Sequence, residues 1–174
     1  MRIYLLRHAE KDSAGIITES GKQAAKALGR KLPAFKQVIA SPSERSKLTA
    51  KLISDQEPIV DARADFSMSS PAKSDAINAL AREKNIPFLE AVTLYNDKEV
   101  LDGVEAKARD LNELLKELQE RGGEGAILVV SHDLSISPAM SQRGVLLQSI
   151  DFLHGYVIQS DGSVASFSPG TPLK

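Results

Sequence analysis

The sequence contains no cysteine among its 174 residues. This absence excludes disulfides, a thiolate nucleophile, and zinc or iron–sulfur sites built on cysteine. It fits a reducing compartment, and we expect the protein to be cytoplasmic. Histidine is also scarce. Any histidine chemistry must come from His8, His132 or His154.

Long apolar runs and excess charge are missing as well. No run approaches the roughly 20 residues that a transmembrane helix needs. Residues 1–6 hold only a short apolar stretch before Arg7, so they do not resemble a signal peptide. The formal net charge is −1, which provides no electrostatic case for nucleic acid or an anionic membrane as a partner.

What is present is typical of one globular domain over residues 1–174, without repeat or linker. Apolar runs predict strands, followed in turn by segments of helical periodicity, which indicates an α/β fold. The expected strands are residues 3–6, 37–40, 126–130 and, more weakly, 59–60. The expected helices begin at Thr18, at Ser41-Pro42 with Leu48, Leu52 and Ile53 as its apolar face, near Asp75 and at Val104.

Three further segments complete this interpretation. Residues 88–95 are apolar, and their pattern does not decide between helix and strand. The first helix should end at Pro33, and the helix from Val104 should end at Gly122-Gly123. Residues 156–159 and 164–167 flank an Asp-Gly turn, which predicts a C-terminal hairpin.

Polar residues follow the three best-predicted strands. Arg7 and His8 follow the first, Ser41 and then Arg45 follow the second, and Ser131, His132 and Asp133 follow the strand at 126–130. Ligands of open α/β sheets bind outside the carboxyl ends of the strands, so these loops can meet in one crevice. Each motif alone is commonly just a cap or a surface element. Their ordered coincidence is what indicates a site.

Two arginines and two histidines suit a dianionic phosphoryl group. Arginine offers a planar fork of donors and stays charged, and Arg45 would lie near a helix N-terminus. One histidine can attack phosphorus, while the other, protonated, stabilises charge on the phosphoryl oxygens. There is no Walker-type glycine loop and no carboxylate cluster at metal spacing. We therefore expect neither a metal nor a cofactor.

These segments resemble the histidine phosphatase superfamily, the phosphoglycerate-mutase-like group. Leu6–Lys11 resembles its strand followed by Arg-His-Gly/Ala-Glu, and Ile17–Ala24 its Leu-Thr-x-x-Gly helix start. Ala40–Ala50 is similar to Ser-Pro-x-x-Arg-x-x-Gln-Thr-Ala, and Val129–His132 to a late strand ending in Gly-His or Ser-His. The resemblance runs from Met1 to about Ile136.

The resemblance implies His8 as nucleophile, with Arg7, Arg45 and His132 holding the phosphoryl group. It also implies a mainly parallel sheet flanked by helices, and no metal. Ala9 stands where glycine is commoner, as in small phosphohistidine-phosphatase-like members. Leu48 stands where many members have glutamine.

The proton donor is where the sequence departs most from the family. Many members carry a glutamate after the third strand, and Asp65 is the carboxylate in that place, with Asp61, Asp97 and Glu99 as alternatives. The family's Gly-Glu-Ser helix start has a shifted counterpart at Gly103.

The sequence contains no clear counterpart of the family's proton donor, and such an acid contributes roughly 10²–10⁴-fold in rate. We therefore expect leaving groups that need little protonation. Phosphohistidine, phosphoramidates, and aryl or acyl phosphates meet this condition. The short chain also lacks the insertions that build deep substrate caps. We therefore expect a phosphatase resembling phosphohistidine phosphatases, acting on a phosphoprotein or a small phosphorylated molecule. The alternatives are a phosphate- or phosphoprotein-binding module without turnover and a phosphomutase. The oligomeric state is left open.

Overall fold

A computed structural model describes residues 1–66, 68 and 70–170. Its sheet has the strand order β3-β2-β4-β1-β5-β6. The strands β1, β2, β3 and β4 run parallel, while β5 pairs antiparallel with β1, and β6 with β5. The predicted mainly parallel sheet and C-terminal hairpin are confirmed. The bounds are β1 Arg2–Arg7, β2 Phe35–Ala40, β3 Ile59–Val60, β4 Ala126–Ser131, β5 Gly155–Gln159 and β6 Val164–Phe167.

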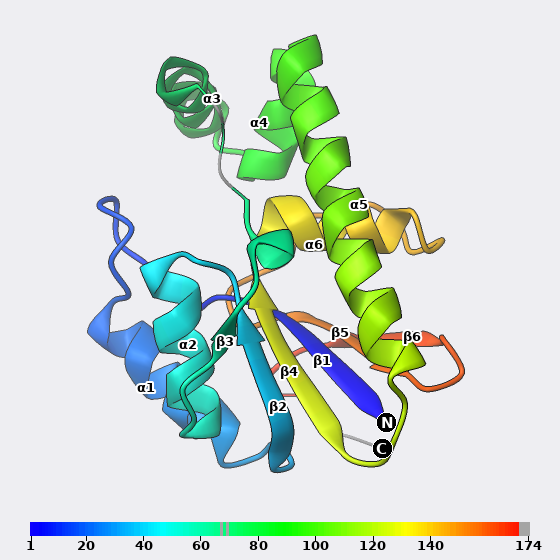
Figure 1. Cartoon of the computed structure of the whole chain (residues 1–174). Coiled ribbons are helices and arrows are strands. Elements are labelled where there is room, and N and C mark those ends of the chain that lie inside the picture. The colour runs from blue at the N-terminus through cyan, green and yellow to red at the C-terminus, as the bar shows by residue number, and fades with distance from the viewer. Residues whose placement is uncertain (67, 69, 171–174) are drawn as a thin grey trace.

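Helices cover both faces of this sheet (Figure 1). The helices α1 and α2 lie on one face, and α5 and α6 on the other, while α3 and α4 stand beyond the carboxyl ends of the parallel strands. The bounds are α1 Glu19–Gly29, α2 Glu44–Ser54, α3 Pro71–Lys84, α4 Phe88–Tyr95, α5 Lys98–Glu120 and α6 Asp133–Ser141. A 3₁₀ turn, η1, spans Ala62–Ala64.

Residues of the central strands alternate between two hydrophobic clusters. In β4, Ile127 and Val129 pack into the cluster that includes the apolar stripe of α5. Leu128 and Val130 pack on the other face, where residues of α1 and α2 complete the cluster. Burial on both faces is why β4 is a continuous apolar run rather than an alternating one.

Capping residues set where the first two helices begin, and the start of the second differs from the prediction. Thr18 caps α1 as expected, accepting from Gly21 N, but the helix ends at Gly29, before Pro33. The second helix is capped by Ser43, whose Oγ accepts from Ser46 N, so Pro42 precedes it. This start sets the helix's rotation. Leu48, predicted in its apolar face, is 37% exposed. The buried face is Thr49, Ala50 and Ile53.

The longest helix, α5, starts earlier than its clearest periodicity. Asp97 caps it by accepting from Val100 N, so Gly103 lies inside the helix, and the helix start predicted at Gly103 is wrong. The predicted face is confirmed: Val104, Ala108, Leu111, Leu115 and Leu118 are all buried. Residues 88–95, undecided from sequence, form α4.

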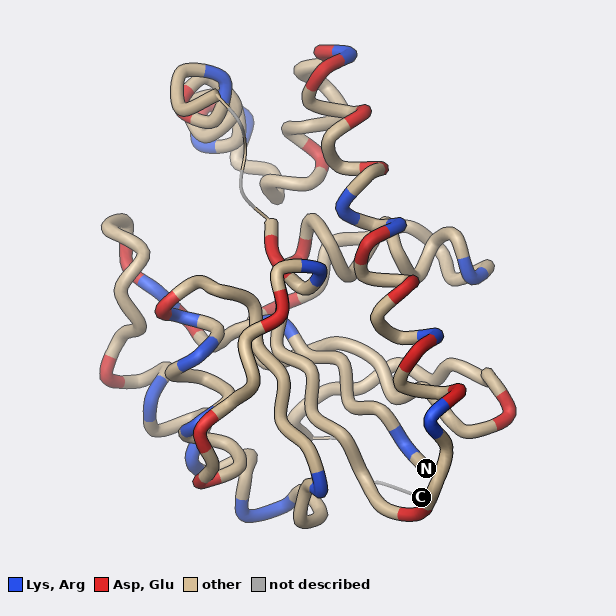
Figure 2. The backbone as a smooth tube through the Cα atoms, in the orientation of Figure 1, with Lys and Arg blue, Asp and Glu red and all other residues tan. Residues whose placement is uncertain are grey.

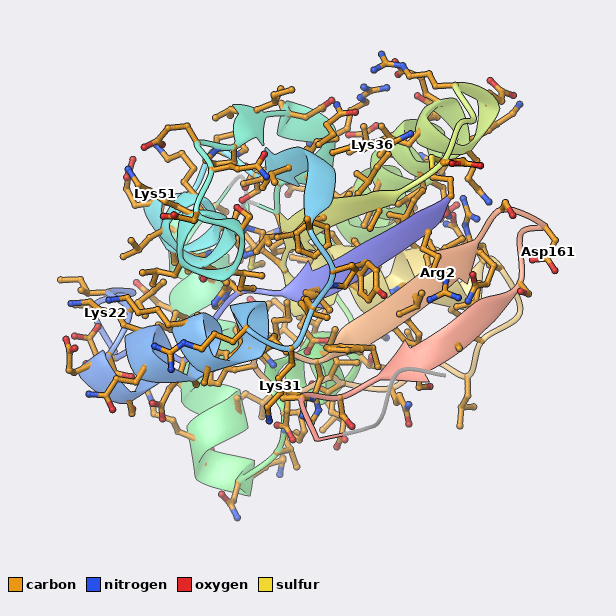
Figure 3. The ribbon with its side chains drawn as sticks, turned by 90° about the horizontal axis from the view of Figure 1, so that it is seen from below. Arg2, Lys22, Lys31, Lys36, Lys51 and Asp161 are labelled. Carbon is orange, nitrogen blue, oxygen red and sulfur yellow. The ribbon has the colours of Figure 1, made fainter. Side chains whose placement is uncertain are left out.

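Charged side chains lie outside these layers. Both signs alternate along the outer face of α5 in Figure 2, with exposed (i, i+4) pairs such as Lys98–Asp102. Seen from below, Lys22 and Lys51 extend outward from α1 and α2 (Figure 3). In the described part of the chain, no helix is long and apolar enough to cross a membrane.

Two helical glycines provide a matched test of this packing. A Cβ at Gly29 would lie 2.1 Å from the Ile53 carbonyl oxygen of α2, whereas a Cβ at Gly103 meets nothing within 4 Å. We expect Gly29→Ala to destabilise the protein by about 1–3 kcal/mol, because α1 and α2 must separate. Gly103→Ala should stabilise it by about 0.5–1 kcal/mol. Urea unfolding measures both, and equal effects would contradict the close approach of the two helices.

Candidate active site

The parallel strands bring the three predicted loops to one place. Arg7 of β1 is paired with Ser131 of β4, and the hydrogen bonding continues beyond the strands. His8 N donates to Ser131 O at 3.1 Å, and Ser41 N donates to Val130 O at 3.1 Å. The backbone at the ends of β1, β2 and β4 is thereby held in fixed register. Arg45 follows in the first turn of α2, near its N-terminus.

His8 is buried, and its neighbours determine which ring nitrogen carries the proton. Its Nδ1 lies 2.8 Å from the carbonyl oxygen of Ala9. A carbonyl can only accept, so the proton lies on Nδ1, and Nε2 keeps its lone pair. That Nε2 accepts a hydrogen bond from Arg45 Nε at 3.2 Å. Burial, together with the neighbouring cations, lowers the pKa of His8 to about 3. The ring is therefore neutral at physiological pH.

His132 lies beside His8, with ring centroids 5.3 Å apart. Its Nδ1 is 3.3 Å from Arg45 Nη2, so one arginine contacts both histidines. Its Nε2 is 2.9 Å from Ser41 Oγ and 3.5 Å from Asp65 Oδ1. Burial lowers the pKa of His132, and the Asp65 carboxylate acts in the opposite direction. An anion in the site would add to the effect of Asp65.

Arg7 is held from several sides. Its guanidinium lies over the Phe152 ring, with Cζ 4.3 Å from the centroid. Its Nη1 donates to Ile150 O and lies 3.8 Å from Asp133 Oδ2. Its Nε is buried and has no partner in the described part of the chain.

Asp133, which the sequence places after the same strand as His132 but to which it assigns no role, holds several groups of the site. Its Oδ1 accepts from Ser137 Oγ at 2.7 Å and from Ile150 N at 3.1 Å. Its Oδ2 accepts from Ser149 Oγ at 2.5 Å. The carboxylate thus ties the segment before β5 to the first turn of α6 and to Arg7. Its position directly after His132 was the available signal.

A cavity of about 440 Å³ opens onto these side chains. Arg7, His8, Arg45 and His132 line it, together with Lys11, which the sequence interpretation missed. Burial lowers the pKa of Lys11, and the nearby charges of Arg45 and Arg7 lower it further. The cations lining the cavity therefore outnumber Asp133, the one carboxylate among its lining residues.

The far wall of the cavity corrects one expectation. The chain was expected to lack the long insertions that build deep substrate caps, yet without them Ser74 and Asn78 of α3 and Phe88 of α4 line the cavity. These helices stand beyond the strand ends in Figure 1. They belong to a separate hydrophobic cluster that includes Ile77, Leu89 and Val92. The cap is made within the region whose sequence pattern was weakest.

The four candidate proton donors are in different surroundings. Asp65 contacts His132, whose hydrogen bond lowers its pKa, and it does not line the cavity. Asp61 pairs with Arg63. Asp97 and Glu99 pair with Lys73. Of the four, Asp65 is the one that touches a site residue, and its role as proton donor stays a prediction.

The comparisons with known proteins fit this geometry. The model of the histidine phosphatase superfamily (branch 1) matches residues 3–145. The chain belongs to this superfamily. The match takes in every residue named above at the histidine pair, from Arg7 to His132, and ends before β5. No curated protein matches the chain significantly.

Solved structures with the superfamily's fold cover nearly the whole chain. A phosphoglycerate mutase from Bacillus anthracis is 19% identical, with a TM-score of 0.66 over 96% of this chain and 91% of that one. An alpha-ribazole phosphatase from Shigella flexneri is 23% identical, with a TM-score of 0.58 over 91% and 90%. A phosphoserine phosphatase from Entamoeba histolytica, in complex with 3-phosphoglyceric acid, is 17% identical, with a TM-score of 0.63 over 96% and 95%. These likenesses establish the fold.

Buried neutral His8 predicts a specific loss of stability in acid. The unfolded chain binds a proton on this histidine below its ordinary pKa of 6.5, whereas the folded state does so only near 3. Between pH 6.5 and 4.5 the unfolded chain therefore binds a proton on His8 and the folded protein does not. The free energy of unfolding falls as the pH falls, by at most about 1.4 kcal/mol per pH unit from this one group. His8→Gln should flatten the pH dependence of urea unfolding in this window. Parallel curves for the two proteins would contradict a buried, neutral His8.

Proposed function

We propose that this protein is a phosphatase that works through a phosphohistidine on His8, without a metal. The observation that carries the proposal is the position of His8 Nε2, which accepts a hydrogen bond from Arg45 Nε at 3.2 Å. The His8 ring also lies beside a second histidine, His132. Membership of the histidine phosphatase superfamily supports it. The substrate is a phosphomonoester or a phosphohistidine, on a small molecule or a protein.

In the first step, His8 Nε2 attacks the phosphorus of the bound phosphoryl group. A bond forms between Nε2 and phosphorus, and the bond to the leaving group breaks with its electron pair on that group. Arg7, Arg45 and His132 hold the three equatorial oxygens, where charge is spread in the transition state. Because the His8 pKa lies near 3, no deprotonation is needed beforehand.

In the second step, water attacks the phosphorus of phosphohistidine. The new oxygen–phosphorus bond forms as the bond to Nε2 breaks, and the electron pair returns to His8. Phosphate and a released proton are the products. His132 becomes a cation most readily when the phosphoryl group is present, and Asp65 at 3.5 Å supports that charge. In place of the proton-donor role predicted from the sequence, we propose Asp65 as a positioning residue behind His132.

The charge of Asp65 also bears on which leaving groups the site can release. Asp65 is ionised, since the hydrogen bond with His132 lowers its pKa, and an ionised carboxylate holds no proton to give to an alkoxide. Phosphohistidine, phosphoramidates, acyl phosphates and aryl phosphates depart with little protonation. We therefore expect them to be hydrolysed faster than simple alkyl phosphates.

Trapping the phosphoenzyme tests the nucleophile. Mixing the protein with a ³²P-labelled phosphoramidate and quenching in alkaline detergent should leave label that is stable in base and lost in acid. His8→Ala should abolish the label, while His154→Ala, outside the cavity, should retain it. Full labelling or full turnover in His8→Ala would overturn the proposal. Phosphate binding without label or turnover would indicate a binding module instead. Transfer to a second substrate hydroxyl, rather than to water, would indicate a phosphomutase.

Arg45 provides a second test, because it contacts both histidines. Arg45→Ala should lower kcat/KM for para-nitrophenyl phosphate by about 10²–10³-fold, as expected for a lost donor to transition-state oxygens. His132→Ala should have a similar effect. Arg45→Lys should recover only part of the loss, since lysine lacks the planar fork. Arg109→Ala, on the exposed face of α5, is the control. An equal loss of kcat/KM in this variant would contradict a specific role of Arg45.

A further inference from the structure

The described residues that line the cavity fall into two chemically different groups. One group is the arginines, Lys11 and the histidines. The other is Phe66, Met68, Phe88 and Leu134, which belong to or pack against one hydrophobic cluster and are called the apolar wall below. Leu134 is buried, and the other three side chains are half-buried, so their remaining surface faces open space. A group attached to the bound phosphate must lie against this wall.

This apolar wall is supported from behind. Phe66, Met68 and Phe88 pack against the cluster that holds α3, α4 and the first part of α5 together. Leu134 is a member of the same cluster and follows Asp133 in α6. The wall is therefore part of a packed core and not a set of isolated surface side chains. Packed aromatic rings present a flat, low-entropy surface to a ligand.

Few uncharged polar groups accompany this wall in the described part of the chain. Among the described residues that line the cavity they are Ser74 and Asn78, one turn apart on α3. The Asn78 amide donates to Ser74 O at 2.9 Å, which leaves its Oδ1 as an acceptor. Together they can satisfy one donor at the far end of a substrate. A leaving group with a hydroxyl on every carbon would need more partners than these described side chains offer, and each unpaired buried hydroxyl would weaken binding.

We propose that the substrates of this site are small phosphomonoesters with a flat apolar body, such as an aryl group, rather than phosphorylated sugars or polyols. This inference rests on the proposed phosphatase function and specifies its substrate class. A cavity of about 440 Å³ is of the size that holds one small molecule. Phe66 and Phe88 act as specificity-determining residues by contacting the body of the substrate.

The reaction chemistry agrees with the shape. An aryloxide needs less protonation than an alkoxide on departure, and among the described residues that line the cavity Asp133 is the one carboxylate. Asp133, the carboxylate that does line it, is engaged by Ser137, Ser149 and Ile150 N and lies beside Arg7. The leaving groups that the wall favours are therefore also those that the site can release.

Non-hydrolysable phosphonates separate binding from turnover. Benzylphosphonate and (2,3-dihydroxypropyl)phosphonate carry the same anionic group but differ in their bodies. We expect the benzyl compound to bind to the wild-type protein at least about tenfold more tightly, measured by calorimetry, because its ring buries apolar area. Equal affinities, or a preference for the diol, would overturn the inference.

Variants then locate the preference. Phe66→Leu and Phe88→Leu keep the wall apolar but remove an aromatic ring, and each should reduce the benzyl preference by about 3- to 10-fold. Tyr95→Leu is the matched control, since Tyr95 packs on the same cluster but does not line the cavity. Its preference should remain that of the wild type. A loss of equal size in Tyr95→Leu would show a general packing effect and overturn the assignment to Phe66 and Phe88.

The two proposals fail separately. If the protein hydrolyses phosphoramidates and acyl phosphates but shows no benzyl preference, the phosphatase stands and the substrate class is wrong. If benzylphosphonate binds tightly and no phosphate compound is turned over, the apolar wall recognises a ligand and the phosphatase is wrong.

Discussion

The structure depends on the concentration of like charge in one buried place. Arg7, Arg45 and Lys11 line the same cavity as His8, and burial lowers the pKa of all three. Neighbouring arginines lower the pKa of Arg45 and Lys11 further, whereas Asp133 and Asp151 act in the opposite direction on Arg7. Such a cluster is stable only if its side chains are held individually. Asp133 and Phe152 hold Arg7, and the two histidines hold Arg45. The net attraction for a dianion is the consequence of this arrangement.

The sheet fixes the backbone of the loops that carry these cations. Three parallel strands, buried on both faces, end together, and the backbone hydrogen bonds of His8 and Ser41 extend the ladder beyond the strands. Further bonds fix the neighbouring loops: Ser131 Oγ donates to Ala64 O at 2.6 Å, and Ser135 Oγ donates to Asp65 O at 3.0 Å. The loop after β3 is therefore tied to β4 and α6, which is how Asp65 reaches His132.

The sequence allowed the strands, the face of α5 and the four residues at the histidine pair to be predicted, because each depends on local patterns. Val104 to Leu118 recur at helical spacing, and Arg7, Arg45 and His132 each follow a strong strand. What could not be predicted depends on tertiary contacts. Leu48 is exposed because Ser43 sets the start of its helix. Asp133 and Lys11 stand next to recognised motifs, but only the tertiary structure shows which groups they contact. The α3–α4 cap has a weak stripe, since only Ile77 is fully buried in α3.

One contact of His8 bears on the order of events in the proposed mechanism. Arg45 donates to Nε2 of His8, the nitrogen that attacks phosphorus in that mechanism. The phosphoryl group must therefore draw the guanidinium toward its own oxygens before the lone pair is exposed. Substrate capture and exposure of the nucleophile then become a single event, and selectivity begins before any part of the substrate beyond its phosphate is recognised.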